Sequence, residues 1–290
     1  MKLSTFNLIY TAFNEPYILK KITEYEFLPK IITSFQDYDN LYLVTNFFEG
    51  DILHNYKNEF FSEEEIKFIS ACIIQSLFYL REKKIINRDI RMKNLIMDHN
   101  RYLNIIDFSF SIDYKDINNS KTFIIGSKFE SSPEMLNHSK YDYNSDYYRI
   151  GIIIYYLIFK KYANMDKRNI PINKYNQNYS SSCIDFINKL LIKDYKKRIG
   201  FNSINELKNH SWFRGFDWEN FEKKKIISPL KFMEKKNNKI ECVKHNISKE
   251  NIINHKRYES NTKYIQLIKN YNYFNKDVIN EIVHSLKNKF

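Results

Sequence analysis

Two aspartates and one asparagine, in a fixed order among short apolar runs, constrain this sequence more than any other feature. Asp89 and Asn94 stand in the segment NRDIRMKN (residues 87–94), and Asp107 follows the apolar run LNII. Residues 85–113 alternate such runs with polar stretches, which is typical of short strands joined by loops. Because reactive side chains usually lie on loops that a rigid scaffold positions, we expect the chemistry of the protein here.

Helical periodicity is clearest on either side of this region. Ser62 and Glu65 match a capping box, and the apolar residues that follow predict a long amphipathic helix. Residues 145–159 leave few polar positions, so a helix there should be buried on most of its sides. The apolar positions of the first helix are Ile66, Ile69, Ile73, Leu77 and Leu80. Further helices are predicted at residues 180–193, 203–211 and 276–288.

A β-strand is predicted between Leu41 and Phe48, where branched and aromatic residues follow a turn at residues 36–40. With 290 residues and 43% apolar content, the chain can bury a sizeable core in one domain, or in one domain plus a tail. Only 5 Gly and 5 Pro stand against 23 Tyr and 23 Phe, so aromatic side chains should fill much of the interior.

The three cysteines, Cys72, Cys183 and Cys242, are odd in number and far apart. That pattern fits a reducing compartment better than a disulfide framework, and we do not expect them to bind metal. No apolar run approaches the roughly 20 residues that a membrane-spanning helix needs. The N-terminal MKLSTFNLIY also does not have the charged-then-apolar order of a signal peptide. We therefore expect a cytoplasmic protein without a membrane span.

The formal net charge of +12 could indicate nucleic acid, an anionic membrane or acidic proteins as partners. Its distribution favours a solvated tail instead, because much of the excess is lysine in the final third rather than on one face with interleaved aromatic residues. Nucleic-acid binding is therefore not expected. The lysines concerned are Lys223, Lys224, Lys225, Lys231, Lys235, Lys236 and Lys239.

The order of Asp89, Asn94 and Asp107 suits phosphoryl transfer. That reaction needs metal ligands at the phosphates, a carboxylate that orients the accepting hydroxyl, and nearby cations. An RD pair, an asparagine five residues after the aspartate and a later DF pair together resemble the catalytic loop and metal-binding aspartate of protein kinases. Three further segments resemble other motifs of this family in the family's order: SSPE (131–134), SDYYRIG (145–151) and KRIG (197–200).

The resemblance implies an α+β, protein-kinase-like fold, mainly the helical C-terminal lobe with a truncated N-lobe β-sheet. Glu134 would pair with Arg198 to brace the substrate-binding segment, and Asp146 would accept backbone hydrogen bonds from the catalytic loop. The implied division of the chain is an N-lobe remnant at residues 1–47, a C-lobe at 48–215, and a basic tail with a terminal helix at 216–290.

For activity, the resemblance implies a protein serine/threonine kinase that transfers the γ-phosphate of ATP to protein substrates. Asp89 would orient the substrate hydroxyl and accept its proton. Asn94 and Asp107 would hold Mg²⁺ on the ATP phosphates. Arg91 stands where the family has a lysine, and it would neutralise the γ-phosphate. Arginine carries the same charge as lysine but presents a wider, forked guanidinium group. ATP and Mg²⁺ are thus the expected cofactors, and the expected partners are a protein substrate and a regulatory protein.

Residues 34–51 and 209–221 resemble the hinge strands and the end of the catalytic domain in the cyclic-nucleotide-dependent kinases and their AGC relatives. By that resemblance, Thr45 would be the gatekeeper beside the adenine pocket. The backbone of Asn46 and Phe48 would bind the adenine edge, and Asp51 would lie near the ribose. Ile96 is the remaining residue expected to contact the nucleotide.

Two family features, a Gly-rich loop over the phosphates and a strand lysine, have no counterpart in this sequence. Aligning residues 14–22 with the family's regulatory helix places Glu15 at the position that pairs with the lysine, and no suitable lysine precedes it. The first strands of the small lobe are thus expected to be absent from this chain. Because proline is tolerated only in the first turn of a helix, Pro16 predicts a helix start with Asn14 as N-cap.

Two interpretations of activity follow: an active kinase seen as a fragment or truncated gene model, and a catalytically inactive pseudokinase that acts as an interaction module. We favour the kinase. Lys93 replaces an acidic residue that would attract a basic substrate in the family. Thr122 could carry a regulatory phosphate paired with Arg88, although a loop threonine is more often simply exposed.

Overall fold

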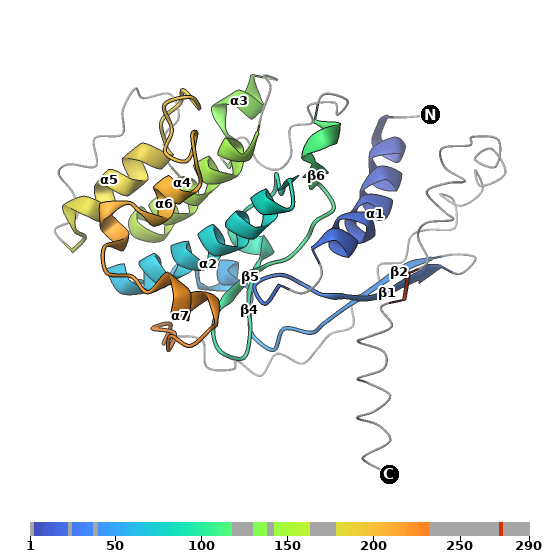
Figure 1. Ribbon diagram of the computed structural model, residues 1–290, viewed down its shortest axis with the longest axis horizontal. Coiled ribbons are helices and arrows are strands. Elements are labelled where there is room, and N and C mark those ends of the chain that lie inside the picture. Colours follow the sequence, from blue (N-terminus) through green and yellow to red (C-terminus); the bar gives the residue numbers. More distant parts are fainter. Residues whose placement is uncertain are drawn as a thin grey trace, which may run out of the picture.

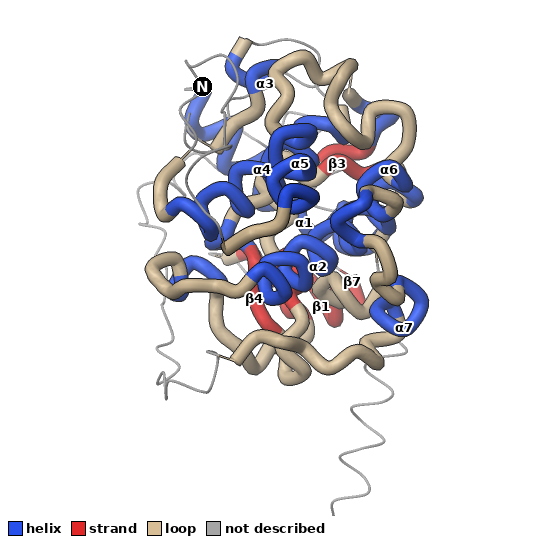
Figure 2. Tube along the Cα trace, turned by 90° about the vertical axis from the view of Figure 1, so that its left-hand side faces the viewer, coloured by secondary structure: helices blue, strands red, loops and turns tan. Residues whose placement is uncertain are grey.

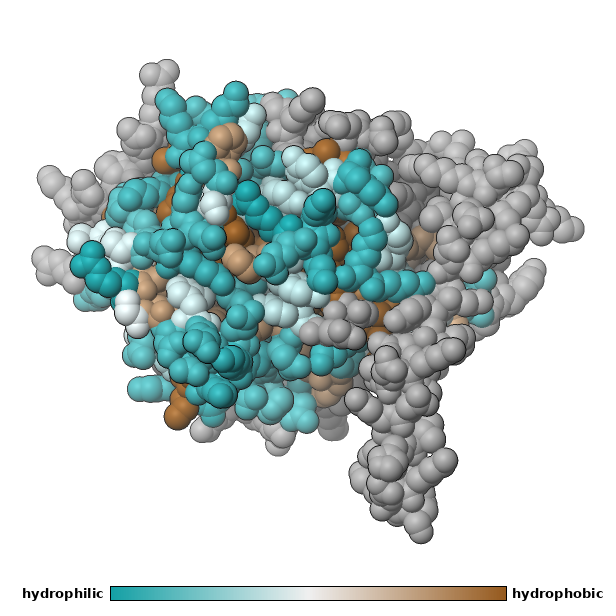
Figure 3. Space-filling view, in the orientation of Figure 1, coloured by the Kyte–Doolittle hydropathy of each residue, from teal (hydrophilic) through white to brown (hydrophobic). Residues whose placement is uncertain are grey.

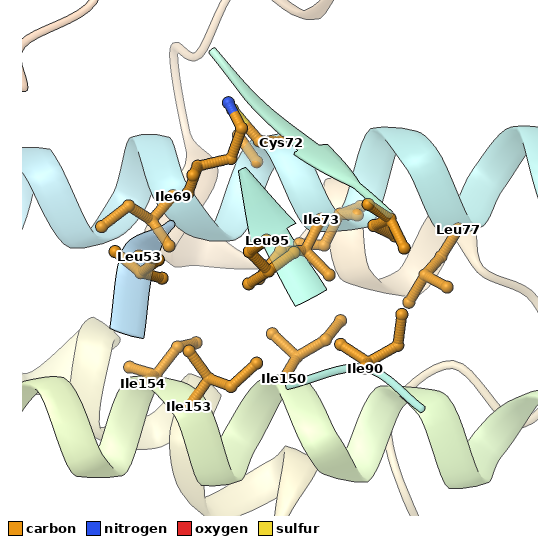
Figure 4. Packing of buried hydrophobic residues seen from close by; sticks show 14 of the residues in the cluster. Leu53, Ile69, Cys72, Ile73, Leu77, Ile90, Leu95, Ile150, Ile153 and Ile154 are labelled. Atoms are coloured by element: carbon orange, nitrogen blue, oxygen red, sulfur yellow. The ribbon is translucent and has the colours of Figure 1, made fainter. Parts of the chain in front are cut away.

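Two central helices, α2 (Glu63–Glu82) and α4 (Tyr143–Phe159), hold much of the core of this computed structural model between them. Figure 4 shows side chains of both helices pointing into the space between them, with Leu53, Ile90 and Leu95 between the two. Burying each such side chain contributes about 1.5–3 kcal/mol to folding. The side chains concerned include Ile69, Ile73 and Leu77 of α2 and Ile150, Ile153 and Ile154 of α4.

The start of α2 is the predicted capping box. The Ser62 hydroxyl accepts a hydrogen bond from the Glu65 N–H, and the Glu65 carboxylate accepts one from the Ser62 N–H at 2.8 Å. The predicted apolar positions of α2 are all buried, and α4 is buried along nearly its whole length. Both long-helix predictions are confirmed. A helix with apolar residues on every side is stable only inside a core.

The structure describes residues 3–22, 25–36, 40–117, 130–137, 142–162 and 178–231, and the strand at 273–274. For residues 3–10 and 273–274, the backbone alone is described. The predicted helix at 276–288, Thr122 and Cys242 lie outside these residues. Within the described part of the chain, no helix is both long enough and apolar enough to cross a membrane.

The shorter helices pack around α4 and α2, and two of them end earlier than predicted. α5 (Ser181–Leu190) ends before residue 193, and α6 (Asn205–Lys208) is shorter than the predicted 203–211 helix. After α6 the His210 side chain accepts the Trp212 N–H and so caps a separate 3₁₀ turn at Ser211–Phe213. The remaining helices are α3 (Pro133–Leu136) and α7 (Trp218–Glu222).

The strands form small antiparallel sheets, and of these strands β1 and β4 lie below α4 in both views (Figure 1 and Figure 2). The strand predicted for residues 41–48 ends at Thr45. Beyond it, the Asn46 side chain, rather than a backbone carbonyl, accepts the Lys30 N–H at 2.7 Å. The pairs are β1 (Ile31–Gln36) with β2 (Leu41–Thr45) and β7 (Tyr273–Phe274), β3 (Ile85–Ile86) with β6 (Ile112–Asp113), and β4 (Leu95–Met97) with β5 (Leu103–Ile105).

The first helix, α1 (Leu3–Lys21), corrects the prediction of a start at Asn14, because Pro16 lies inside it. The Asn14 side chain is not an N-cap. Its amide instead donates to the carbonyls of Ser109 at 2.9 Å and Ser111 at 2.7 Å. A proline inside a helix costs about 3 kcal/mol. These tertiary hydrogen bonds and the burial of apolar residues near the end of α1 offset that cost; those residues are Ile18, Leu19 and Ile22.

Residues 223–231 follow α7 and contact the turn that joins β4 to β5. The Tyr102 hydroxyl donates to the Ile226 carbonyl at 2.6 Å, and Arg101 donates to the Leu230 carbonyl at 3.1 Å. The Lys224 side chain is only 12% exposed and pairs with Asp98. The expectation of a solvated tail is therefore wrong for Lys224. On the face shown in Figure 3, hydrophilic side chains predominate among the described residues.

Candidate active site

The loop that carries Asp89 is held by a buried carboxylate of α4. Asp146 accepts the backbone N–H groups of Asn87 and Arg88, each at 2.8 Å. Arg88 has a left-handed backbone with φ of 69°, which a residue other than glycine keeps only when its surroundings hold it. The predicted role of Asp146 is confirmed, so the position of the loop depends on the central helix.

Asn87 shapes the turn into Asp89. Its side-chain oxygen accepts the Asp89 N–H at 3.0 Å, and its amide reaches the Ser111 hydroxyl at 3.5 Å. A short polar side chain that bonds to the backbone two residues ahead forms an Asx turn. Asparagine thus keeps the loop ordered at a position where the resembled family has histidine or tyrosine.

Asp89 contacts Asn94 and two arginines. The Asn94 amide donates to the Asp89 side chain at 2.7 Å and to its carbonyl at 3.0 Å. Arg91 Nε lies 3.4 Å from one carboxylate oxygen of Asp89, and Arg149 Nη1 lies 3.4 Å from the other. The structure therefore brings together three of the residues that the sequence predicted for catalysis, and adds a fourth.

The Asp89 side chain is almost completely buried, with 2% of its surface exposed. Burial raises the pKa of Asp89, and the charges of Arg149 and Arg91 oppose that rise. The result is a carboxylate that is more basic than usual, while the two arginines favour its ionised form. Such a group is suited to accept a proton from a hydroxyl placed beside it.

Asn94 and Asp107 lie at the same end of the β4–β5 hairpin, because the Asn94 carbonyl accepts the Ile106 N–H at 2.9 Å. The Asn94 side-chain nitrogen donates to Asp89. The side-chain oxygen of Asn94 accepts no hydrogen bond within the described residues and is available to a ligand. One carboxylate oxygen of Asp107 accepts the Ser109 N–H at 3.1 Å. The other carboxylate oxygen accepts no hydrogen bond within the described residues.

One amide oxygen and one carboxylate oxygen suit a magnesium ion, which takes few protein ligands when substrate phosphates supply the rest. Among the described residues, no group of three or more His, Cys, Asp and Glu side chains could hold a metal ion. Asn94 and Asp107 are therefore the candidate ligands in this part of the chain.

Glu15 connects α1 to the segment after Asp107. Its carboxylate accepts the Phe108 N–H at 2.9 Å and the Ser109 hydroxyl at 3.3 Å. Burial raises the pKa of Glu15, and the hydrogen bond from Phe108 opposes the rise. Phe108 itself is fully buried in the same core as Ile18 of α1. A shift of α1 would therefore displace the segment that carries Asp107.

The residues predicted for adenine binding lie on the segment after β2, which runs beside β4. The Gly50 N–H donates to the Met97 carbonyl at 3.2 Å, and the Met97 N–H donates to the Asp51 carbonyl at 3.1 Å. A Cβ at Gly50 would lie 2.7 Å from that Met97 oxygen, so only glycine permits this approach. Ile52 and Ile96 form a β-bridge, which places Ile96 next to the segment.

Several backbone groups of this segment are available to a ligand. The Asn46 N–H donates to the Lys30 carbonyl at 3.0 Å, whereas among the described residues the Asn46 carbonyl accepts only the Thr45 hydroxyl, at 3.3 Å. The Phe48 N–H and carbonyl have no hydrogen-bond partner in the described part of the chain. The Asp51 carboxylate accepts two hydrogen bonds within its own loop, each at 2.7 Å.

Glu134 and Arg198 form the predicted ion pair. Two parallel hydrogen bonds of 2.7 and 2.9 Å join the guanidinium to the carboxylate, and Ser145 donates to the same carboxylate at 2.9 Å. Arg198 also donates to the Asn144 carbonyl at 2.7 Å. Both charged side chains are buried. The pair fixes α3 to the start of α4 and to the loop after α5.

Arg149 is the residue of this site that the sequence interpretation missed. Its side chain is 1% exposed, and burial lowers the pKa of its guanidinium while the charges of Asp89 and Asp146 oppose that shift. The signal was present in the sequence, since an arginine inside a helix predicted to be buried requires a buried acidic partner. The motif resemblance of residues 145–151 gave no reason to look for one.

The chain matches the family model described as "Protein kinase domain" over residues 3–213. A probable serine/threonine-protein kinase of Dictyostelium discoideum is 32% identical over 226 residues, which are 74% of this chain and 49% of that protein. Serine/threonine-protein kinase sgk-1 of Caenorhabditis elegans is 32% identical over 241 residues, 78% of this chain and 50% of that protein.

A putative protein kinase C delta type homolog of Drosophila melanogaster is 27% identical over 229 residues, 75% of this chain and 34% of that protein. The chain thus spans about half or less of the length of these relatives. Residues 3–213, which match the family model, include the loop with Asp89, the hairpin with Asn94 and Asp107, and the buried Glu134–Arg198 pair.

Proposed function

Because this chain belongs to the protein kinase family, we propose that it transfers the γ-phosphate of ATP to serine or threonine hydroxyls of protein substrates. The observation that carries the proposal is the arrangement around Asp89. A buried carboxylate of raised pKa is contacted at one oxygen by Asn94 and Arg91 and at the other oxygen by Arg149. Two of the relatives are named as serine/threonine-protein kinases, which supports the choice of serine and threonine.

In this proposal Asp89 receives the substrate hydroxyl. It orients the oxygen for attack in line with the phosphate and accepts the hydroxyl proton. The hydrogen bond from Asn94 and the support of the loop by Asp146 fix the direction of the carboxylate. Positioning of this kind supplies much of the rate in phosphoryl transfer, because the protein does little covalent chemistry.

The other groups of the site would stabilise the negative charge of the ATP phosphates. The family implies ATP and a divalent metal ion, and we assign Asn94 and Asp107 as the ligands of Mg²⁺. Bound metal would neutralise part of the phosphate charge. Arg91, whose side chain is 30% exposed, would place its guanidinium against the transferred phosphate and orient it.

We assign nucleotide binding to the segment after β2. The carbonyl of Asn46 and the N–H and carbonyl of Phe48 would bind the adenine edge, with Thr45 and Ile96 beside the ring. Asp51 would bind the ribose. The support is that these backbone groups are available in the described structure, whereas the Asn46 N–H is not.

The cellular setting is part of the same proposal. The two described cysteines, Cys72 and Cys183, are free and buried, which is consistent with the cytosol. We also keep the division into an N-lobe remnant, a C-lobe and a basic tail at residues 1–47, 48–215 and 216–290, and a regulatory protein as partner.

Titration of the full chain with ATP and Mg²⁺ should raise its melting temperature. At a nucleotide concentration about tenfold above Kd, binding would stabilise the protein by about 1.4 kcal/mol, or about 3–5 °C for a domain of this size. Differential scanning fluorimetry with and without Mg²⁺ measures this. Replacing Asp107 by Asn should remove most of the rise in melting temperature that depends on Mg²⁺. Absence of any shift at millimolar nucleotide would defeat the enzyme proposal for this chain and favour an inactive interaction module.

Replacing Arg149 by Met should destabilise the fold by about 1–3 kcal/mol, because the buried Asp89 carboxylate loses one of its donors. Phosphoryl transfer should also slow, since the carboxylate is no longer held from the side of α4. Thermal unfolding and kcat measure the two effects. Arg149→Lys is the matched control and should recover part of both. Unchanged kcat in Arg149→Met would show that Arg149 has no part in positioning Asp89.

A further inference from the structure

A group of basic side chains lies beside Asp89 on two short 3₁₀ turns, which we call the basic rim: His54, Lys57, Arg91 and Lys93. The first two belong to the turn at Leu53–Tyr56 and its end, and the last two to the turn at Met92–Asn94 and its start. The β-bridge of Ile52 with Ile96 joins the two turns. Lys57 Nζ lies 3.5 Å from His54 Nε2, and Arg91 is the residue that contacts Asp89.

The basic rim is short of negative partners in the described part of the chain. Lys93 is exposed, and neither Lys57 nor Lys93 has a carboxylate within 4.0 Å there. This positive charge affects His54. Burial lowers the pKa of the His54 imidazole, and the charges of Lys57 and Lys93 lower it further. The rim therefore presents concentrated positive charge to solvent.

The acidic groups near the rim have other hydrogen-bond or charge partners in the described structure. Glu130 accepts a hydrogen bond from the Tyr162 hydroxyl at 3.4 Å. Asp51 accepts two hydrogen bonds within its own loop. Lys160 donates to the Glu59 carbonyl, and the charge of Glu59 opposes the burial that lowers the pKa of Lys160. Of these carboxylates, Glu130 also acts on His54, and its effect is smaller than those of Lys57 and Lys93.

We propose that the substrates of this chain carry acidic residues close to the accepting serine or threonine. The inference rests on the proposed function, since it assumes that a peptide places its hydroxyl at Asp89. A peptide in that position must pass within reach of the basic rim, and Lys57 and Lys93 lack partners of their own in the described structure. Acidic side chains would supply those partners, whereas lysine or arginine near the hydroxyl would meet like charge.

The test is peptide binding, which does not depend on catalysis. Three fluorescent peptides with alanine at the acceptor position would be compared on the full chain by anisotropy: one flanked by Asp and Glu, one by Lys and Arg, and one by Gly and Ser. We expect the acidic peptide to bind about 10-fold or more tighter than the neutral one. The difference should shrink at high salt, because exposed charges are screened.

Charge reversal assigns the preference to the rim. The double variant Lys57→Glu with Lys93→Glu should abolish or invert it, and Lys93→Glu alone should weaken it. Lys197→Glu makes the same charge change on a side chain that is 79% exposed and outside the rim, and should leave the preference unchanged. Melting temperatures would show that the variants are folded.

Equal binding of all three peptides, tighter binding of the basic peptide, or an effect of Lys197→Glu equal to that of the rim variants would overturn the inference. Transfer of phosphate to matched serine peptides separates this from the proposed function. Phosphorylation with a basic preference would leave the kinase proposal intact and remove the substrate class. An acidic binding preference without phosphorylation would contradict the kinase proposal, and with it the assignment of the bound peptides as substrates.

Discussion

Replacing Asp89 by Asn should lower kcat for phosphoryl transfer by about 10²–10⁴-fold while the chain stays folded. The amide has nearly the shape of the carboxylate and can still accept the hydrogen bond from Asn94. It cannot accept a proton from the substrate hydroxyl. The loop itself should keep its place, because Asp146 holds it through backbone groups of Asn87 and Arg88.

The measurement is kcat and KM for a serine peptide, with thermal unfolding of the same samples. Asp194→Asn is the matched control, because it makes the same chemical change at a side chain that is 49% exposed. It should leave kcat unchanged. If Asp89→Asn phosphorylates the peptide as fast as the unmodified chain, Asp89 is not the proton acceptor.

Replacing Glu134 by Ala should destabilise the protein by about 3–5 kcal/mol, because it leaves the buried Arg198 guanidinium without its carboxylate. The expected fall in melting temperature is about 10 °C or more. The double variant Glu134→Leu with Arg198→Met removes both charges and should recover part of the loss. Chemical unfolding of the single and double variants measures the coupling between the two residues. A single variant as stable as the unmodified chain would contradict this account.

The pair should also make stability depend on pH in a predictable direction. Burial alone would raise the pKa of Glu134, but the hydrogen bonds and charge of Arg198 hold it below its ordinary value of 4.5. A lowered pKa in the folded state adds stability above pH 4.5, and this is lost as pH falls through the folded-state pKa. The difference in stability between the unmodified chain and Glu134→Ala should therefore shrink in acid.

Much of this fold and site could be predicted from local pattern and motif order. The Ser62–Glu65 capping box and the buried helix at α4 follow from side-chain periodicity, which depends on neighbours in sequence. The hydrogen bonds of Asp146 to the Asp89 loop join segments that are distant in sequence, and so does the Glu134–Arg198 ion pair. They were predicted only because motifs in a known order fix which segments meet.

The features that the sequence did not predict depend on tertiary contacts between residues that belong to no recognisable sequence motif. The Asn14 amide bonds to carbonyls of residues 109 and 111, so α1 continues through Pro16 against its local preference. Lys224 pairs with Asp98 because residues 223–231 return to the turn between β4 and β5. Arg149 reaches Asp89 across 60 positions in sequence, and no spacing rule connects the two.

The central claim is that this chain transfers phosphate through Asp89 to serine or threonine. Incorporation of labelled γ-phosphate from ATP with Mg²⁺ into a serine peptide, with the Asp89→Asn chain as the blank, measures it directly. We expect incorporation well above the blank for serine and threonine peptides and none for a matched tyrosine peptide. Incorporation by the unmodified chain no greater than by the Asp89→Asn chain would contradict the account.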